Sequence, residues 1–183
     1  MIDNRQQAVV VLEDVHDPHN AEAVFRSCDA MGVHHINLVF IKQKPWDPVG
    51  MGHSSSATSH KWLEFTTYHS TEQCIGELRD DGFQIIATCL RDDSVSLYEA
   101  DLTAPKVAIM VGNEHRGLSD TAINLADSRL MVPMRGMVQS LNLSVTTALC
   151  LFEMTRQRLA KGMDGYGLDP AVKDDIFETL IDR

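Results

Sequence analysis

The sequence has no long apolar run and no paired cysteines. None of its apolar stretches approaches the roughly 18 residues that a membrane-spanning helix needs. The N-terminus, MIDNRQQAVVV, has no basic region ahead of an apolar core and does not resemble a secretion signal. The cysteines, which are Cys28, Cys74, Cys89 and Cys150, form no C-x-x-C pair, and this favours buried free thiols over disulfides or zinc. These absences predict a cytoplasmic protein that has no membrane or metal partner.

Several common nucleotide and hydrolase motifs are also missing. Gly112 and Gly117 have the G-x-x-x-x-G spacing of the phosphate loop, but Leu118 stands where that motif needs its lysine. No G-x-G-x-x-G follows the first apolar run, and G-x-S-x-G does not occur. His16 and His19 lie three residues apart, but no third ligand follows at metal-binding spacing. The sequence therefore disfavours a nucleotide hydrolase, a dinucleotide enzyme and a metalloenzyme.

Positive charge is scarce overall but unevenly distributed. The formal net charge is −10, which argues against a nucleic-acid partner because phosphate binding normally requires an excess of Lys and Arg. Between Lys106 and Lys161, however, seven basic residues accompany four acidic ones, so this segment carries +3 and the remainder −13. Arg156, Arg158 and Lys161 can complement the C-terminus of a helix. The alternative is a local basic face.

Apolar runs alternate with helical patterns along the chain. Nearly continuous apolar runs predict buried parallel strands at 8–12, 36–40, 84–88, 107–111 and 129–132. Helical patterns occur at 20–31, 71–80, 119–126 and 141–161. We expect Asn20 to cap the first helix and Gly32 to follow its end. This alternation predicts an α/β domain with a mostly parallel sheet flanked by helices.

The C-terminal segment 169–183 differs from the rest of the chain. It places Val172, Ile176 and Leu180 four residues apart among many acids, which predicts an acidic amphipathic helix. At 183 residues the chain is long enough for one domain and short for two. We therefore expect one domain over 1–168 and a final helix that packs on the same domain or on a partner subunit.

Polar residues gather where the strands are expected to end. Ligands of parallel sheets bind beyond the carboxyl ends of the strands, so the loops of interest are 17–20, 87–93, 112–119 and 132–142. Arg26 lies among apolar neighbours and needs an acceptor or a water-filled cleft; an ion pair with Glu114 would satisfy it. Ser140 and Asn142 could be simple caps of the long helix. Together these groups, at separate strand ends, indicate a site.

Three stretches resemble the motifs of one enzyme family. They are LEDVHDPHNAEAVFRSCDAMGV at 12–33, VGNEHRGLS at 111–119 and VPMRGMVQSLNLSVTTALCLFE at 132–153. These resemble the three motifs of the SpoU, or TrmH, branch of the SPOUT RNA methyltransferases. SHKW at 59–62 and RQRLAKGM at 156–163 are also similar to the tRNA guanosine 2'-O-methyltransferases of that branch.

The resemblance implies a fold and a cofactor. The family's α/β domain ends in a deep trefoil knot, an exception to the rule against knots, which is expected here at about residues 107–160. The knot forms a bent pocket for S-adenosylmethionine, whose product is S-adenosylhomocysteine. The family's cofactor contacts fall on Thr88, Gly112, Val132 and Leu141, and mostly backbone groups hold the adenine.

The resemblance also implies a catalytic group. Arg26 matches the family's catalytic arginine, with Asn20, Glu114, Ser140 and Asn142 as its supporting residues. The reaction transfers a methyl group from a sulfonium to a ribose 2'-hydroxyl. A guanidinium, with a pKa above about 12, is a poor proton acceptor at neutral pH. We therefore expect Arg26 to hold phosphate and ribose in position, losing a proton at most transiently.

The expected substrate is tRNA, at a guanosine in the D-loop region. Ribosomal RNA is one alternative, and a dimer that binds S-adenosylmethionine only as a binding module is another. Related tRNA enzymes carry a basic helical extension before the first strand, which is expected to be absent because AVVV is reached by residue 8. Family members are homodimers whose clefts combine residues of both subunits. We expect the apolar helix faces near the C-terminus to form that interface.

Overall fold

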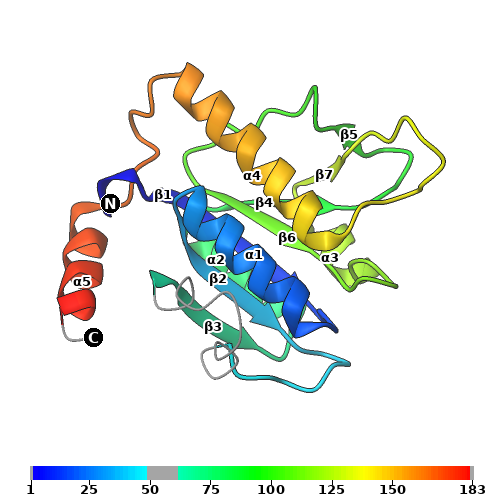
Figure 1. The fold of residues 1–183 in the computed structure, drawn as a ribbon, viewed down its shortest axis with the longest axis horizontal. Helices are drawn as coiled ribbons and strands as arrows, with labels where there is room; N and C mark the ends of the chain where they lie inside the picture. Colours follow the sequence, from blue (N-terminus) through cyan, green and yellow to red (C-terminus); the bar gives the residue numbers. More distant parts are fainter. Residues whose placement is uncertain (1, 49–61, 182–183) are drawn as a thin grey trace.

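A single parallel sheet organises the molecule (Figure 1). The structure, a computed structural model, describes residues 2–48 and 62–181, and within them seven strands pair in the order β3-β2-β1-β6-β4-β7-β5. All pairings are parallel. The strands are β1 (Gln6–Glu13), β2 (Val33–Val39), β3 (Glu64–Tyr68), β4 (Gln84–Thr88), β5 (Val95–Ser96), β6 (Val107–Val111) and β7 (Ser128–Met131). The predicted mostly parallel sheet is confirmed.

Two of these strands are not predicted by the sequence. β3, EFTTY, is an edge strand in which Tyr68 alone is buried, so it lacks the apolar run typical of a central parallel strand. β5 has only two residues and lies at the opposite edge. The five predicted runs are all strands, and β1 and β2 begin earlier than their apolar residues indicate.

Helices cover both faces of the sheet (Figure 1). They are α1 (Pro18–Ala30), α2 (Thr71–Asp80), α3 (Asp120–Leu125), α4 (Leu143–Ala160) and α5 (Pro170–Ile181), with a short 3₁₀ helix, η1 (Ile2–Asn4), before β1. Val10 and Leu12 of β1 join the core beneath α1 and α4, whereas Val9 and Val11 join the core beneath α2 and α3. Because side chains alternate along a strand, β1, β2, β4 and β6 each supply both cores.

The first helix begins two residues earlier than predicted. Asp17, and not Asn20, is its N-cap: the Asp17 side chain accepts a hydrogen bond from the backbone N–H of His19 over 2.9 Å. Pro18 occupies the first turn, where its missing N–H costs nothing. Because Asp17 caps the helix, the side chain of Asn20 is available for other contacts. Gly32 does follow the helix end, at a φ of 75°.

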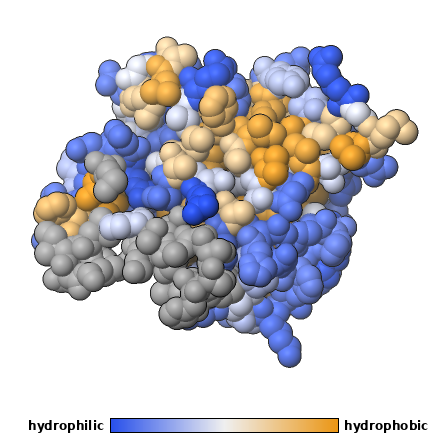
Figure 2. Space-filling view, in the orientation of Figure 1, coloured by the Kyte–Doolittle hydropathy of each residue, from blue (hydrophilic) through white to orange (hydrophobic). Residues whose placement is uncertain are grey.

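The longest helix, α4, buries one apolar face and leaves a second group of apolar side chains exposed. It begins at Leu143, with Asn142 as its N-cap. The face that packs on the sheet holds Leu143, Cys150, Leu151 and Met154. Three of its apolar side chains, Val145, Leu149 and Phe152, remain exposed, as does Leu159 two turns beyond Phe152. Figure 2 shows hydrophobic residues gathered over the region where Figure 1 places α4.

The C-terminal helix α5 packs near the N-terminus of its own chain (Figure 1). Ile176 is buried, and the ammonium of Lys173 lies 3.4 Å from the Asp3 carboxylate. Val172, predicted on the same apolar face, is instead exposed. The side chain of Leu180 lies outside the described residues, as does most of the SHKW stretch.

Two basic residues of the segment 106–161 are engaged within the fold. Arg158 is completely buried, where its guanidinium donates to the carbonyl oxygen of Ala104 and stacks on the ring of Tyr166. Burial lowers the pKa of Arg158 to about 10. Arg156 forms a two-point ion pair with Glu153 on the same helix. These two side chains therefore have structural partners within α4 and the loops that pack on it.

Three of the cysteines, Cys28, Cys74 and Cys150, are buried free thiols as predicted, whereas Cys89 is partly exposed. Burial raises the pKa of the Cys74 and Cys150 thiols to about 12. Across residues 2–48 and 62–181, no helix is long and apolar enough to cross a membrane. The same residues contain no group of three or more His, Cys, Asp or Glu side chains that could hold a metal ion.

Candidate active site

A cleft of about 1070 Å³ lies beyond the carboxyl ends of β4, β6 and β7. The loops that follow these strands form its walls, and the start of α1 closes one side. Eight of the nine predicted site residues line this cleft: Asn20, Thr88, Gly112, Glu114, Val132, Ser140, Leu141 and Asn142. A volume near the upper end of the usual range of roughly 300–1,000 Å³ is sufficient for a cofactor and part of a second ligand.

A chain of side-chain hydrogen bonds crosses one wall of the cleft. The amide of Asn142 donates to Oδ1 of Asn20 over 2.9 Å, and the amide of Asn20 donates to Oε1 of Glu114 over 3.0 Å. Oδ1 of Asn142 meanwhile accepts from the backbone N–H of Ser144 over 2.8 Å and caps α4. Glu114, Asn20 and Asn142, which come from three separate motifs, are therefore joined by hydrogen bonds. Asn142 both caps α4 and takes part in this hydrogen-bond series.

Glu114 lies at one end of this series of hydrogen bonds and is held there by backbone groups. Its carboxylate also accepts from the backbone N–H groups of His16 over 2.9 Å and Asp17 over 3.1 Å. Burial raises the pKa of Glu114, but the hydrogen bonds from Asn20 and from the backbone N–H groups more than offset burial, so the pKa lies below its ordinary value. An ionised Glu114 thus ties the GNEHRGLS loop to the start of α1.

Backbone and apolar groups form the rest of the cleft. The hydroxyl of Thr88 donates to the carbonyl oxygen of Met110 over 2.8 Å, which fixes the end of β4 to β6. At Gly112 a Cβ atom would lie 2.2 Å from backbone atoms of Gly117 and Leu118, so only glycine permits this fold of the loop. Val132 and Leu141 add apolar surface. The wall therefore offers backbone groups and small or apolar side chains, as an adenosine-binding pocket requires.

Two predicted residues differ from expectation. Ser140 lines the cleft, but its side chain is exposed and forms no hydrogen bond with any residue in the described ranges. Of the two candidate caps, Asn142 alone caps α4. Arg26 is exposed and does not line the cleft of its own chain.

The proposed ion pair between Arg26 and Glu114 is wrong. Glu114 is occupied by Asn20, His16 and Asp17, whereas Arg26 forms no hydrogen bond or ion pair with a described residue. The physical reason is the helical rotation between residues: Val24, Phe25 and Cys28 of α1 face the core, whereas Arg26 lies on the outer side of the helix. The apolar neighbours of Arg26 in sequence are not its neighbours in space.

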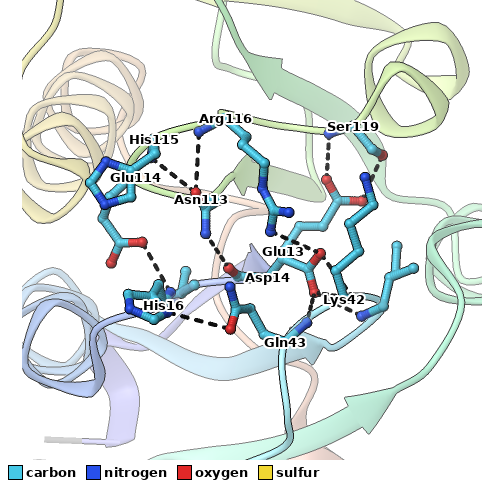
Figure 3. Close-up of polar contacts among 12 residues, drawn as sticks. Glu13, Asp14, His16, Lys42, Gln43, Asn113, Glu114, His115, Arg116 and Ser119 are labelled. Atoms are coloured by element: carbon cyan, nitrogen blue, oxygen red, sulfur yellow. Dashed lines mark hydrogen bonds and ion pairs between the residues drawn. The ribbon is translucent and has the colours of Figure 1, made fainter.

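A second group of polar residues was missed by the sequence analysis. Asp14 and Asn113 join the end of β1, the 41–43 segment and the GNEHRGLS loop (Figure 3). Glu13, which is also buried, accepts from the Ser119 backbone N–H over 2.6 Å and from the hydroxyl of Thr71. The available signal was a pair of acids, Glu13-Asp14, directly after an apolar strand, where ligand-facing residues are expected.

The fold and the site together define an α/β domain that binds a ligand at the strand ends. The chain belongs to the SpoU rRNA Methylase family, whose sequence model matches residues 7–152. It is 42% identical over 169 residues to a tRNA (guanosine(18)-2'-O)-methyltransferase of Thermus thermophilus, covering 92% of this chain and 84% of that protein.

Solved structures agree with this assignment. The structure of the Aquifex aeolicus TrmH/SpoU tRNA modifying enzyme matches with a TM-score of 0.85 and 33% identity, over 99% of this chain and 91% of that chain. The AdoMet-bound rRNA methyltransferase from Sinorhizobium meliloti matches with a TM-score of 0.71 and 30% identity, over 85% of this chain and 58% of that chain.

Proposed function

We propose that the protein is an S-adenosylmethionine-dependent RNA 2'-O-ribose methyltransferase that acts on a guanosine in the D-loop region of tRNA. The Thermus thermophilus relative is named for guanosine 18 of tRNA, and a Sinorhizobium meliloti rRNA methyltransferase binds AdoMet. The hydrogen-bonded chain Glu114–Asn20–Asn142 carries the proposal, because it joins all three family motifs at one cleft. Ribosomal RNA is the alternative substrate, since other relatives are rRNA enzymes.

The cleft fits the cofactor. The residues assigned to cofactor binding, which are Thr88, Gly112, Val132 and Leu141, all line this one cleft, and they come from the ends of β4, β6 and β7 and the loops that follow. The tight packing of Gly112 against Gly117 keeps side chains out of the space where backbone groups would meet an adenine. S-Adenosylmethionine supplies an electrophilic methyl group, so the protein has only to orient the acceptor oxygen and remove its proton.

Asn20, Asn142 and Ser140 are proposed to orient the ribose. Asn20 and Asn142 already hold each other, and the hydroxyl of Ser140, without a protein partner in the described ranges, is available for a substrate oxygen. Arg26 is proposed to hold the ribose and its phosphate with paired N–H groups. Its planar fork fixes two oxygens at once, which aligns the 2'-oxygen with the methyl carbon.

Arg26 is proposed to act in the cleft of a second subunit. Val145, Leu149, Phe152 and Leu159 form an exposed apolar stripe on α4, and α4 packs beside α1 (Figures 1 and 2). An exposed stripe of this kind marks a protein interface. A two-fold dimer through this stripe would bury it and bring α1, with Arg26, beside the partner.

The segment at about 107–160 is proposed to be threaded as a deep trefoil knot. In its support, β6 lies at the centre of the sheet between β1 and β4, β7 lies beyond β4, and α4 then crosses back to pack on α1. This path carries the chain across the strand ends after the 132–142 loop. Residues 1–168 would form the methyltransferase domain, with 169–183 as an appended acidic helix.

We also propose that the protein works in the cytoplasm. Its buried free thiols Cys28, Cys74 and Cys150 suit a reducing compartment. The catalytic and cofactor roles given above include no metal ion.

Two measurements test the function. In calorimetry, we expect binding of S-adenosylmethionine and no binding of ATP. In a transfer assay, the protein is incubated with labelled S-adenosylmethionine and either total tRNA or total rRNA, and we expect label in the tRNA. Label confined to rRNA would establish the alternative substrate, and cofactor binding without transfer to either RNA would show a binding module.

A further inference from the structure

One buried carboxylate organises two cations beside the cleft (Figure 3). Oδ1 of Asp14 accepts hydrogen bonds from three successive backbone N–H groups, those of Ile41, Lys42 and Gln43, over 2.8, 2.9 and 3.1 Å. Oδ2 of Asp14 lies 3.7 Å from the guanidinium of Arg116. Asp14 therefore fixes the backbone that carries Lys42 and also attracts the side chain of Arg116.

Asn113 links Asp14 to the loop that carries Arg116, and we call this pair the Asp14–Asn113 bracket. Its amide donates to the carbonyl oxygen of Asp14 over 2.8 Å, and its Oδ1 accepts from the backbone N–H groups of His115 and Arg116 over 2.9 and 3.1 Å. Asp14 itself has a φ of 52°, a left-handed conformation that is uncommon for residues other than glycine, although aspartate adopts it more readily than most. Strained backbone of this kind is typical of functional sites, where the surrounding contacts hold it.

Lys42 and Arg116 lie between two clefts. A smaller cleft of about 330 Å³ lies beside the main one, at the ends of β1, β2 and β3. Lys42 and Arg116 line both clefts. The ammonium of Lys42 forms no hydrogen bond or ion pair with a described residue, and the Arg116 side chain is 48% exposed. Both cations are thus available to a ligand that spans the two clefts.

The acids of the smaller cleft do not cancel these cations in full. Glu13 is 2% exposed and already accepts from Thr71 and Ser119. Asp14 is 7% exposed, with its acceptor positions filled by backbone N–H groups. Glu72 is the exposed acid, and it accepts from the hydroxyl of Ser70 over 2.8 Å. A phosphate entering from solvent would therefore meet Lys42 and Arg116 more closely than the buried carboxylates.

We propose that Lys42 and Arg116 form a subsite for the RNA backbone, which binds a phosphodiester next to the nucleotide held in the main cleft. The inference rests on the proposed function and deepens it. Phosphate contacts of this kind position a nucleic acid without reading its sequence. The subsite would hold the strand on the ridge between the clefts, so that one nucleotide enters the main cleft and its neighbour lies over the smaller one.

The test is the binding of a tRNA transcript by the full-length protein, measured by fluorescence anisotropy at several KCl concentrations. Lys42→Ala and Arg116→Ala should each weaken binding roughly tenfold, and each should reduce the salt dependence by about one ion. Lys44→Ala is the matched control, because Lys44 is an exposed cation two residues from Lys42 that lines neither cleft. It should bind RNA like the wild type.

Two further measurements separate the alternatives. The affinity for S-adenosylmethionine, measured by calorimetry, should be unchanged in both variants; a weaker affinity would mean that these cations bind the cofactor's carboxylate, and would overturn the proposal. Glu72→Gln should strengthen RNA binding, since it removes the exposed acid. If Lys42→Ala and Arg116→Ala, folded as judged by thermal unfolding, bind RNA like Lys44→Ala, the subsite does not exist.

Failure of the subsite and failure of the proposed function give different results. RNA binding is measured without methyl transfer, so the subsite can be established in a protein that transfers nothing. Conversely, an active methyltransferase whose RNA affinity does not depend on Lys42 and Arg116 would retain its function and lose the subsite.

Discussion

The side-chain amide of Asn142 donates to Oδ1 of Asn20 over 2.9 Å, although the two residues are 122 positions apart. Asn142 also begins α4 by accepting from the Ser144 backbone N–H, and Asn20 is tied in turn to Glu114. The start of one helix therefore sets the orientation of a side chain on another. Asn142 therefore both caps α4 and orients Asn20 in the site.

Asn142→Asp should separate those two consequences. Aspartate keeps the cap, so the free energy of unfolding should stay within about 0.5 kcal/mol of wild type. It cannot donate to Asn20, so methyl transfer should fall by roughly tenfold or more. Asn142→Ala should lose both, with about 1 kcal/mol of stability. Chemical denaturation and initial rates measure these effects; full activity in Asn142→Asp would show that the bond to Asn20 is dispensable.

Arg26→Lys should reduce activity without affecting stability. Arg26 is exposed and has no partner among the described residues, so thermal unfolding should be unchanged. Lysine keeps the positive charge but loses the planar fork, and the transfer rate should fall at least roughly tenfold. A wild-type rate for Arg26→Lys would exclude both positioning and transient proton loss as the role of this residue.

Glu114 should make stability depend on pH. Its pKa is lowered in the folded state, so its ionised form stabilises the protein above the unfolded pKa of about 4.3, and this contribution is lost as the pH falls through the lower folded value. Glu114→Gln should be less stable than wild type at pH 7, and the gap in unfolding free energy should narrow as the pH falls below the unfolded pKa. Urea unfolding on both sides of that pKa measures it; a constant gap would show that ionisation of Glu114 has no part in stability.

The α4 stripe should hold the dimer together. Phe152→Asp places a charge in the middle of the proposed interface, at a side chain that is 56% exposed in the single chain. The variant should remain folded but elute as a monomer in size-exclusion chromatography with light scattering, because an isolated charge is costly to bury. Asp80→Asn, an exposed acid on α2, which packs on the opposite face of the sheet from α4, serves as the control. A dimeric Phe152→Asp would place the interface elsewhere.

Mixing two impaired variants should raise activity above that of either alone. If Arg26 serves the partner's cleft, a mixed dimer of Arg26→Ala and Asn142→Asp has one site with both defects and one intact site. Refolding the two proteins together at equal amounts should then recover about a quarter of wild-type activity, because half of the dimers are mixed. No recovery would mean that Arg26 and Asn142 act within the same chain.

The sequence carried enough information to predict the sheet and most of the cleft. Continuous apolar runs predict central strands because parallel strands are buried on both faces, and the polar loops after them supply eight residues of the cleft. It was insufficient where neighbours in sequence are not neighbours in space. Arg26 faces outward from α1, and the apolar stripe of α4 faces away from the sheet.

The Asp14–Asn113 bracket could not be predicted for a related reason. Its hydrogen bonds join residues 99 positions apart, and its effect depends on a strained backbone angle at Asp14. Local composition marks Glu13-Asp14 as acids at a strand end, but it does not distinguish an aspartate with these contacts from an ordinary residue of a turn. Hydrophobic periodicity reports which face is buried, but it does not report which polar atoms meet.

The central claim is that this cleft directs a methyl group to a ribose oxygen of tRNA. The most direct measurement is mass spectrometry of nucleosides from a tRNA transcript treated with the protein and S-adenosylmethionine. We predict 2'-O-methylguanosine from a single D-loop position, and at least roughly tenfold slower formation with Asn142→Asp. A methyl group on a base, or no methylated nucleoside from a protein that binds both cofactor and tRNA, would contradict the claim.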